Sequence, residues 1–133
     1  ETQLFSKDSL ARRKPQHPAI VAEVSGKVRG WATLSPYNLR TGWRFVGEDS
    51  VFIHPESQGK GLGKLLLAEI LLRAKSHGLR TVIARISGDQ PASLGLHATL
   101  GFAEVGRLRK AGFKSGQWLD CVYMERDLEV PQP

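Results

Sequence analysis

Cysteine is nearly absent from this sequence, and so are long apolar runs. Cys121 is the only cysteine, which excludes a disulfide within the chain and a cysteine-rich zinc site. No apolar run reaches the roughly 20 residues that a membrane-spanning helix needs. The four histidines are scattered without the spacing of metal ligands, so we predict no metal site. These absences favour a protein of the reducing cytoplasm without a membrane part.

The chain is basic and of single-domain length. Nineteen lysines and arginines against thirteen aspartates and glutamates give a formal net charge of +6 over 133 residues. Such a charge favours an anionic partner, either a nucleic acid, a phosphate-bearing cofactor or an acidic surface. The basic residues are spread along the chain and no DNA- or RNA-binding motif is found, so we expect no nucleic-acid partner. We expect residues 1–133 to form a single domain.

Hydrophobic patterns predict a mixed α/β domain around one sheet. The β-rich runs 19–24 and 28–34 flank the turn signal Ser25-Gly26-Lys27, which predicts a hairpin. The predicted order is β-β-β-α-β-α-β-β, with further strands at 46–53, 79–86, 102–108 and 118–128 and helices at 62–77 and 91–100. A glycine-rich connection is expected between the last two strands, and residues 1–18 have weak helical character.

The first predicted helix carries an apolar stripe on one side. Its members recur with the helical period: Leu62, Leu66, Ile70 and Ala74, with Leu65 and Leu72 expected to widen the stripe. Gly78 is typical of a helix end. We expect Asp89 or Gln90 to cap the second helix, with Pro91 in its first turn.

A glycine-rich turn precedes the first helix. The first N–H groups of a helix lack partners and carry partial positive charge, so they attract anions. The turn Gln58-Gly59-Lys60-Gly61-Leu62-Gly63 lets the backbone approach an anion closely, and Lys64 adds charge. It matches neither the P-loop nor the dinucleotide-binding pattern, but it fits Gln/Arg-x-x-Gly-x-Gly/Ala. We predict a phosphate or pyrophosphate site; a glycine-rich helix entry without a ligand is the alternative.

This turn resembles that of the GNAT N-acetyltransferases. The segments EDSVFIHPESQGKGLG, SLGLHATLGF and RLRKAGFKSGQWLDCVYMERDL together resemble the phosphinothricin and methionine sulfone acetyltransferase subfamily, over nearly all of the chain from about Ala19. The resemblance implies a GNAT-type mixed central sheet flanked by helices. It also implies that the family's N-terminal strand and first helix are missing from this chain, so that the domain is incomplete at its N-terminus.

The resemblance implies transfer of an acetyl group from acetyl-CoA, as co-substrate, to an amine. The cofactor-binding residues that it implies are Phe52, Ile53, Gln58, Gly59, Lys60, Gly61, Leu62, Gly63, Lys64, Gln90 and Ser93. Among them, Phe52–Ile53 would supply a backbone N–H to the oxyanion of the reaction, and their strand would pair with the pantetheine arm. Gln90 departs from the asparagine usual in the family.

Two residues are candidates for proton transfer. Because an alkyl amine is mostly protonated at neutral pH, a carboxylate or histidine must take its proton. Glu48 matches the family's base, although a solvated acid at a strand end is the alternative. Alternation places Glu48 and Asp49 on opposite faces of the sheet. By the resemblance, His97 stands where many GNAT enzymes have a tyrosine as general acid. Its imidazole could act as acid, base or water relay, and a buried structural histidine is the alternative.

The acceptor pocket is expected to lie between the loop PYNLRTGWRF and the segment GFKSGQW. We predict that its apolar walls are formed by Tyr37, Trp43, Phe113 and Trp118. We predict that a carboxylate or phosphinate of the acceptor is bound by Arg40, Arg44 and Lys114. Asn38 stands where relatives often have an arginine, so Arg40 is the substitute we consider. The predicted acceptor is the primary amine of phosphinothricin, methionine sulfone or sulfoximine, or a similar small molecule.

The sequence also allows other acceptors and a function without catalysis. A polyamine or a protein N-terminus could be the acceptor, and a non-catalytic module that binds CoA or phosphate would keep the turn without needing Glu48 and His97. Relatives pair as dimers, so we expect a homodimer.

Overall fold

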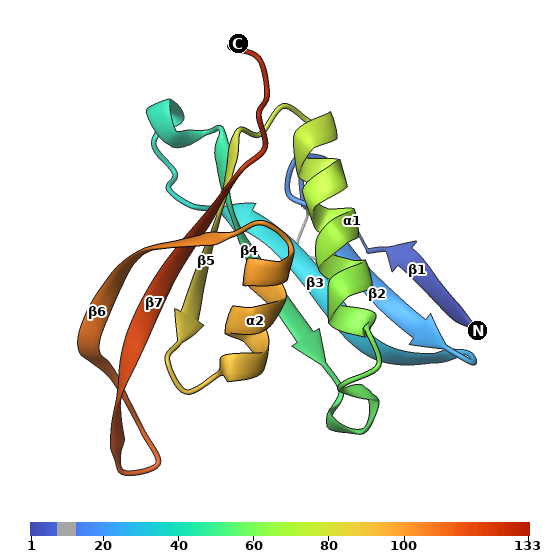
Figure 1. Ribbon diagram of the computed structural model, residues 1–133. Coiled ribbons are helices and arrows are strands. Elements are labelled where there is room, and N and C mark those ends of the chain that lie inside the picture. The colour runs from blue at the N-terminus through green and yellow to red at the C-terminus, as the bar shows by residue number, and fades with distance from the viewer. Residues whose placement is uncertain (8–12) are drawn as a thin grey trace.

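The computed structural model describes residues 1–7 and 13–133. Within these residues, seven strands form a single central sheet, and two α-helices pack on it (Figure 1). The spatial order is β1-β2-β3-β4-β5-β7-β6, and of these neighbours only β4 and β5 run parallel. The strands are β1 (Thr2–Ser6), β2 (Ala19–Val24), β3 (Lys27–Pro36), β4 (Val46–Ile53), β5 (Thr81–Ser87), β6 (Ala103–Lys114) and β7 (Gln117–Asp127). The helices are α1 (Leu62–Ser76) and α2 (Pro91–Thr99), with short 3-10 turns η2 (Thr41–Trp43) and η3 (Pro55–Ser57). The predicted mixed α/β class and the order of elements from β2 onward are confirmed.

The β2–β3 hairpin forms where the turn signal predicted it. Ser25 and Gly26 both have positive φ, 52° and 81°. Two such residues make the tight turn whose twist matches that of the flanking strands. The hairpin then continues into β4, because β3 pairs with it antiparallel from Gly30–Ile53 to Pro36–Gly47.

The apolar stripe that helix α1 buries contains the four predicted residues but is widened by a different leucine. Leu62, Leu66, Ile70 and Ala74 are buried, as predicted. The expectation for Leu65 and Leu72 is wrong, since these side chains are 49% and 65% exposed. Leu67 widens the stripe instead. At about 100° per residue, positions 65 and 72 lie on the side that faces solvent, whereas position 67 adjoins the sheet.

Strand β6 is longer than predicted, whereas β7 has the predicted length and lies one residue earlier in the sequence. Strand β6 continues to Lys114 and pairs with β7, and only Ser115 and Gly116, both with positive φ, form the turn. The expected glycine-rich connection is therefore mostly strand. A register shift between Leu108 and Gly112 marks an irregularity in β6, and extra residues of that kind blur the two-residue alternation on which the prediction relied.

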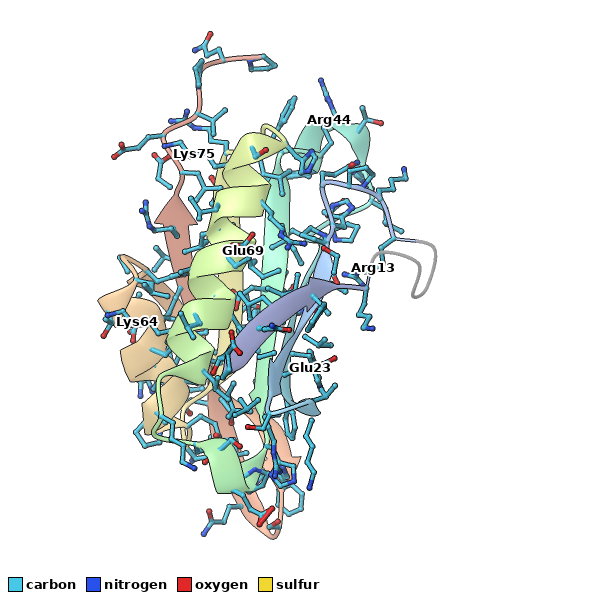
Figure 2. All side chains as sticks on the ribbon, turned by 90° about the vertical axis from the view of Figure 1, so that its right-hand side faces the viewer. Arg13, Glu23, Arg44, Lys64, Glu69 and Lys75 are labelled. Carbon is cyan, nitrogen blue, oxygen red and sulfur yellow. The ribbon has the colours of Figure 1, made fainter. Side chains whose placement is uncertain are left out.

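The N-terminal residues are extended where weak helical character was expected. Thr2–Ser6 form strand β1, which pairs antiparallel with β2 from Thr2–Val24 to Ser6–Ile20. Residues 8–12, which belonged to the same expectation, lie outside the described residues. The added strand places β1 at one edge of the sheet, beside α1 in Figure 2.

Both helices cover the same face of the sheet, and the other face carries no helix among the described residues (Figures 1 and 2). Helix α1 packs on β2, β3 and β4, and α2 packs on β5. Side chains from both helices join one apolar core with Val51 and Val82. Because side chains alternate along a strand, neighbouring residues of β4 face two different environments.

Candidate functional site

Strands β4 and β5 separate halfway along their length. They pair only over Val46–Glu48 and Thr81–Ile83, and no register is found between them beyond Glu48. A cavity of about 250 Å³ opens there, lined by residues of β4, β5 and α2 that include Asp49, Arg85 and His97. A parallel sheet that opens at the carboxyl ends of its strands is a common place for a ligand.

The glycine-rich turn lies at the end of the separated part of β4. Gly59 and Gly61 have φ of +76° and +84°, and a Cβ at either would meet nothing within 4 Å. The backbone N–H groups of residues 59–64 have no acceptor among the described residues. A helix start with free N–H groups and no side chains in front of it binds anions.

A second cavity, of about 500 Å³, runs from the open edge of β4 to this turn. Most of the predicted cofactor-binding residues line it: Phe52, Ile53, Gln58, Gly59, Gly61, Leu62, Gly63, Lys64, Gln90 and Ser93. Lys60 is exposed and does not line it. Gln58 donates from Nε2 to the Ile53 carbonyl at 3.3 Å, which holds the turn against the end of β4. Gln90 precedes α2 as its N-cap but makes no side-chain capping bond.

Alternate backbone groups of β4 face the opening. The bonds from Tyr37 N to Val46 O and from His54 N to Arg29 O fix which β3–β4 pairs exchange hydrogen bonds. By that alternation Phe52 bonds to β3, whereas the N–H groups of Val51 and Ile53 point into the cavity. Of the predicted Phe52–Ile53 pair, only Ile53 can therefore offer its N–H to a ligand.

Glu48 forms an ion pair on the helix-free face. Its Oε2 accepts from Nε of Arg85 at 2.8 Å, and the side chains are 21% and 50% exposed. Glu48 is the last residue of β4 that pairs with β5. The ion pair thus bridges the two strands where they begin to separate.

His97 and Asp49 form a second acid–base pair on the opposite face, under α2. Asp49 Oδ2 lies 2.8 Å from His97 Nε2, and both side chains are almost fully buried. His97 Nδ1 lies 2.8 Å from the carbonyl oxygen of Ser93, so Nδ1 carries a proton and donates it. Burial lowers the pKa of His97, but the hydrogen bond and charge of Asp49 and the hydrogen bond to Ser93 together outweigh burial, so the net pKa is raised. Asp49 Oδ1 is buried without a partner among the described residues.

The predicted acceptor residues do not come together in this chain. Tyr37 and Trp43 contact each other, with ring centroids 6.3 Å apart, beside η2. Phe113 and Trp118 contact each other at 5.0 Å across the β6–β7 turn. Figure 1 shows these two places at opposite ends of the sheet. A single pocket between them, as expected from the sequence, is not formed.

The basic residues predicted to bind the acceptor lie near those same aromatic pairs. Arg44 donates to the Thr41 carbonyl and stacks at 4.5 Å on the ring of Phe45. Figure 2 shows Arg44 at the end of the molecule away from η3. Arg40 lies in the same exposed loop, and Lys114 ends β6 at the hairpin turn. None of the three lines either cavity.

Sequence reasoning missed Asp49 and Arg85. The alternation of β4 indicated that Glu48 and Asp49 face opposite ways. It could not indicate which face α2 covers, and therefore which acid meets His97. For Arg85 the available signal was a charged residue within an otherwise apolar strand.

No group of three histidine, cysteine, aspartate or glutamate residues suited to a metal is found in the described part of the chain. Within the same residues, every helix is too short or too polar to cross a bilayer.

Comparison with known proteins identifies close relatives. A profile described as the acetyltransferase (GNAT) family matches residues 1–102. The phosphinothricin N-acetyltransferase of Alcaligenes faecalis is 44% identical over 115 residues, which cover 85% of this chain and 58% of that protein. The L-methionine sulfoximine/L-methionine sulfone acetyltransferase of Salmonella typhimurium is 36% identical over 119 residues, covering 90% of this chain and 70% of that protein.

Solved structures have the same fold. The phosphinothricin acetyltransferase of Sinorhizobium meliloti, in complex with acetyl-CoA, superposes with a TM-score of 0.84 at 40% identity. The match covers 90% of this chain and 64% of that one. The chain thus spans less than two thirds of the Alcaligenes and Sinorhizobium proteins.

Proposed function

This chain belongs to the acetyltransferase (GNAT) family, and we propose that it moves an acetyl group from acetyl-CoA to the primary amine of a small acceptor. The observation that carries the proposal is the separation of β4 from β5, which leads to a glycine-rich turn with free N–H groups. Both reactants would meet in one ternary complex, where the amine attacks directly.

The second cavity fits the co-substrate. Free N–H groups at residues 59–64 suit a pyrophosphate, and Lys64 adds positive charge. The inward-facing N–H groups of Val51 and Ile53 suit the amides of a pantetheine arm and the carbonyl of a thioester. Gln90 and Ser93 line both cavities, where they would border the reactive end of the arm.

Two acid–base pairs flank the reaction point. Acetyl transfer forms a C–N bond, breaks the C–S bond and moves a proton from nitrogen towards sulfur. Glu48 is the proposed base, because its carboxylate lies on the open face beside the separation of the strands. His97, held by Asp49 and Ser93, is the proposed proton source on the helix-covered face.

The acceptor is proposed to be an amino-acid-like amine, on the model of the relatives named for phosphinothricin and for methionine sulfoximine and sulfone. The acceptor residues predicted from the sequence form two distant groups, Tyr37–Trp43 with Arg40 and Arg44, and Phe113–Trp118 with Lys114. A small acceptor can contact only one of these groups in a single chain.

We also propose a homodimer in the cytoplasm. Trp31 and Phe52 stack at 5.9 Å on the helix-free face, and each is at least 40% exposed. A second copy of the chain would cover such surface. Light scattering after size exclusion would give twice the monomer mass, and a monomer mass at micromolar concentration would contradict the dimer.

An assay of thiol release from acetyl-CoA tests the proposed activity. We expect release with phosphinothricin, methionine sulfone or methionine sulfoximine, and little with spermidine or a protein N-terminal peptide. Glu48→Gln should lower kcat by about 100-fold or more, the range of general base catalysis, while acetyl-CoA still binds. Binding of acetyl-CoA without release for any amine would instead indicate the non-catalytic module.

A further inference from the structure

Of the residues that the structure describes, Arg85 is the one basic side chain, apart from His97, that lines the cavity where β4 and β5 separate. It extends from β5 on the helix-free face and donates from Nε to Glu48 at 2.8 Å. The bond joins the proposed base to a guanidinium at the point where the two strands stop pairing with each other.

The guanidinium has donors left for a ligand. Nε donates to Glu48, and the phenol oxygen of Tyr123, the residue opposite Arg85 on β7, also interacts with the guanidinium. These two partners do not use all five N–H groups of an arginine. Half of the side chain is exposed. The hydrogen bond and charge of Glu48 raise the pKa of Arg85, so the group stays charged wherever the protein is active. Two terminal nitrogens of a guanidinium match the two oxygens of a carboxylate.

We propose that Arg85 binds the carboxylate of an α-amino acid acceptor, and so sets the preference of the enzyme for amino acids over simple amines. The inference rests on the proposed function. In an α-amino acid a single carbon separates the amine from the carboxylate, so the protein groups that face them must be neighbours. Glu48 and Arg85 are such neighbours. The carboxylate of Glu48 would face the amine of the acceptor, and the guanidinium of Arg85 would face its carboxylate.

The other basic residues expected near the acceptor do not fit this position. Arg44 is held by Thr41 and Phe45 beside η2, and Lys114 lies at the β6–β7 turn. His97 is buried on the other face with Asp49. Arg40 lies in the exposed loop, where its backbone N–H donates to Asn38. Arg85, on β5, is the basic residue that the cavity between β4 and β5 brings next to Glu48.

The test compares two acceptors that differ only in the carboxylate. Methionine sulfone and its decarboxylated analogue, 3-(methylsulfonyl)propylamine, are assayed with the wild-type chain and with Arg85→Ala. We expect the ratio of kcat/KM for the two acceptors to fall by about 10- to 100-fold in the variant, which is the effect of losing a charge-assisted hydrogen-bond pair. Most of this loss should appear as a higher KM of the variant for methionine sulfone. Arg85→Lys should restore part of the ratio, because a lysine keeps the charge without the planar fork.

Arg80→Ala is the matched control. Arg80 is also a half-exposed arginine with an acidic partner, Asp127 at 3.5 Å, but it precedes β5 at the other end. Its loss should leave the ratio unchanged. Equal losses for both acceptors in Arg85→Ala would overturn the inference, since Arg85 would then only orient Glu48. Transfer by the wild type to amines but not to the sulfone would also overturn it, and no transfer to any amine would overturn the proposed function as well.

Discussion

Asp49 and Glu48 are neighbours in sequence, but their surroundings differ completely. Glu48 lies on the open face with a half-exposed arginine, so water screens its ion pair and the acid remains accessible. Asp49 lies on the covered face against a buried imidazole. Because Nδ1 of His97 already donates to Ser93, the contact between Nε2 and Oδ2 must contain one proton. The buried pair thus holds a proton in place, whereas the Glu48–Arg85 pair lies where solvent can reach it.

The proton of the buried pair predicts a pH dependence of stability. Burial lowers the pKa of His97 in the folded chain, but the contacts with Asp49 and Ser93 together outweigh burial, so the folded pKa is raised. A raised pKa stabilises the fold fully below the unfolded value of about 6.5, and this contribution is lost as the pH rises through the folded value. Thermal melts of the wild type should therefore show an advantage over Asp49→Asn near pH 6 that shrinks towards pH 9.

Asparagine is a suitable replacement because its amide can donate to a neutral Nε2, so the variant should still fold. Titration of the His97 ring followed by NMR gives the direct control. The midpoint should fall in Asp49→Asn, because burial then acts without the opposing charge. Equal midpoints in the two proteins would contradict the assignment.

The candidate site could be predicted from the sequence only in part, and these two acids show why. Period-two alternation separates Glu48 from Asp49, but the face that receives a helix depends on where α2 packs after β5. That packing is a long-range contact between residues 49 and 97. The glycine-rich turn could be predicted because all its parts are adjacent in sequence.

At the scale of elements, the turn before α1 should be sensitive to any side chain. Gly61 has φ of +84°, and an L-residue in that region costs roughly 1–2 kcal/mol. Gly61→Ala should therefore lower stability and also weaken acetyl-CoA binding by about tenfold or more, because it alters the N–H groups that face the anion. Calorimetric titration with CoA would measure the binding.

Gly26 offers a matched control for the backbone strain. It has φ of +81° and, like Gly61, nothing within 4 Å of an added Cβ, but it lies in the β2–β3 turn. Gly26→Ala should cost similar stability and leave CoA affinity unchanged. If both variants lose affinity equally, strain rather than anion binding explains the effect.

The elements themselves could be predicted wherever local patterns are strong. The limits of β4 and the start of α1 agree with the prediction, because Pro55 and the glycines mark the ends and apolar residues keep their period. Strand β1 could not be predicted, since its residues are mostly exposed and it is held by long-range contacts: pairing with β2, packing of Leu4 on the core and a bond from Arg73 to Ser6. The extension of β6 was missed for a similar reason, because Gly112 and a register shift interrupt the alternation.

At the scale of the whole molecule, the net charge of +6 strengthens ligand binding only where the basic residues face the anionic ligand. Figure 2 shows Lys64 near the start of α1 and Lys75 at its other end. Both are exposed lysines on one helix, but only Lys64 lines the second cavity. Lys64→Ala should weaken CoA binding by about three- to tenfold at low salt, and much less at about 0.5 M salt, where the charge is screened. Lys75→Ala should have no effect at either salt concentration. Equal losses for the two lysines would mean that the overall charge, and not a local anion site at the start of α1, attracts the ligand.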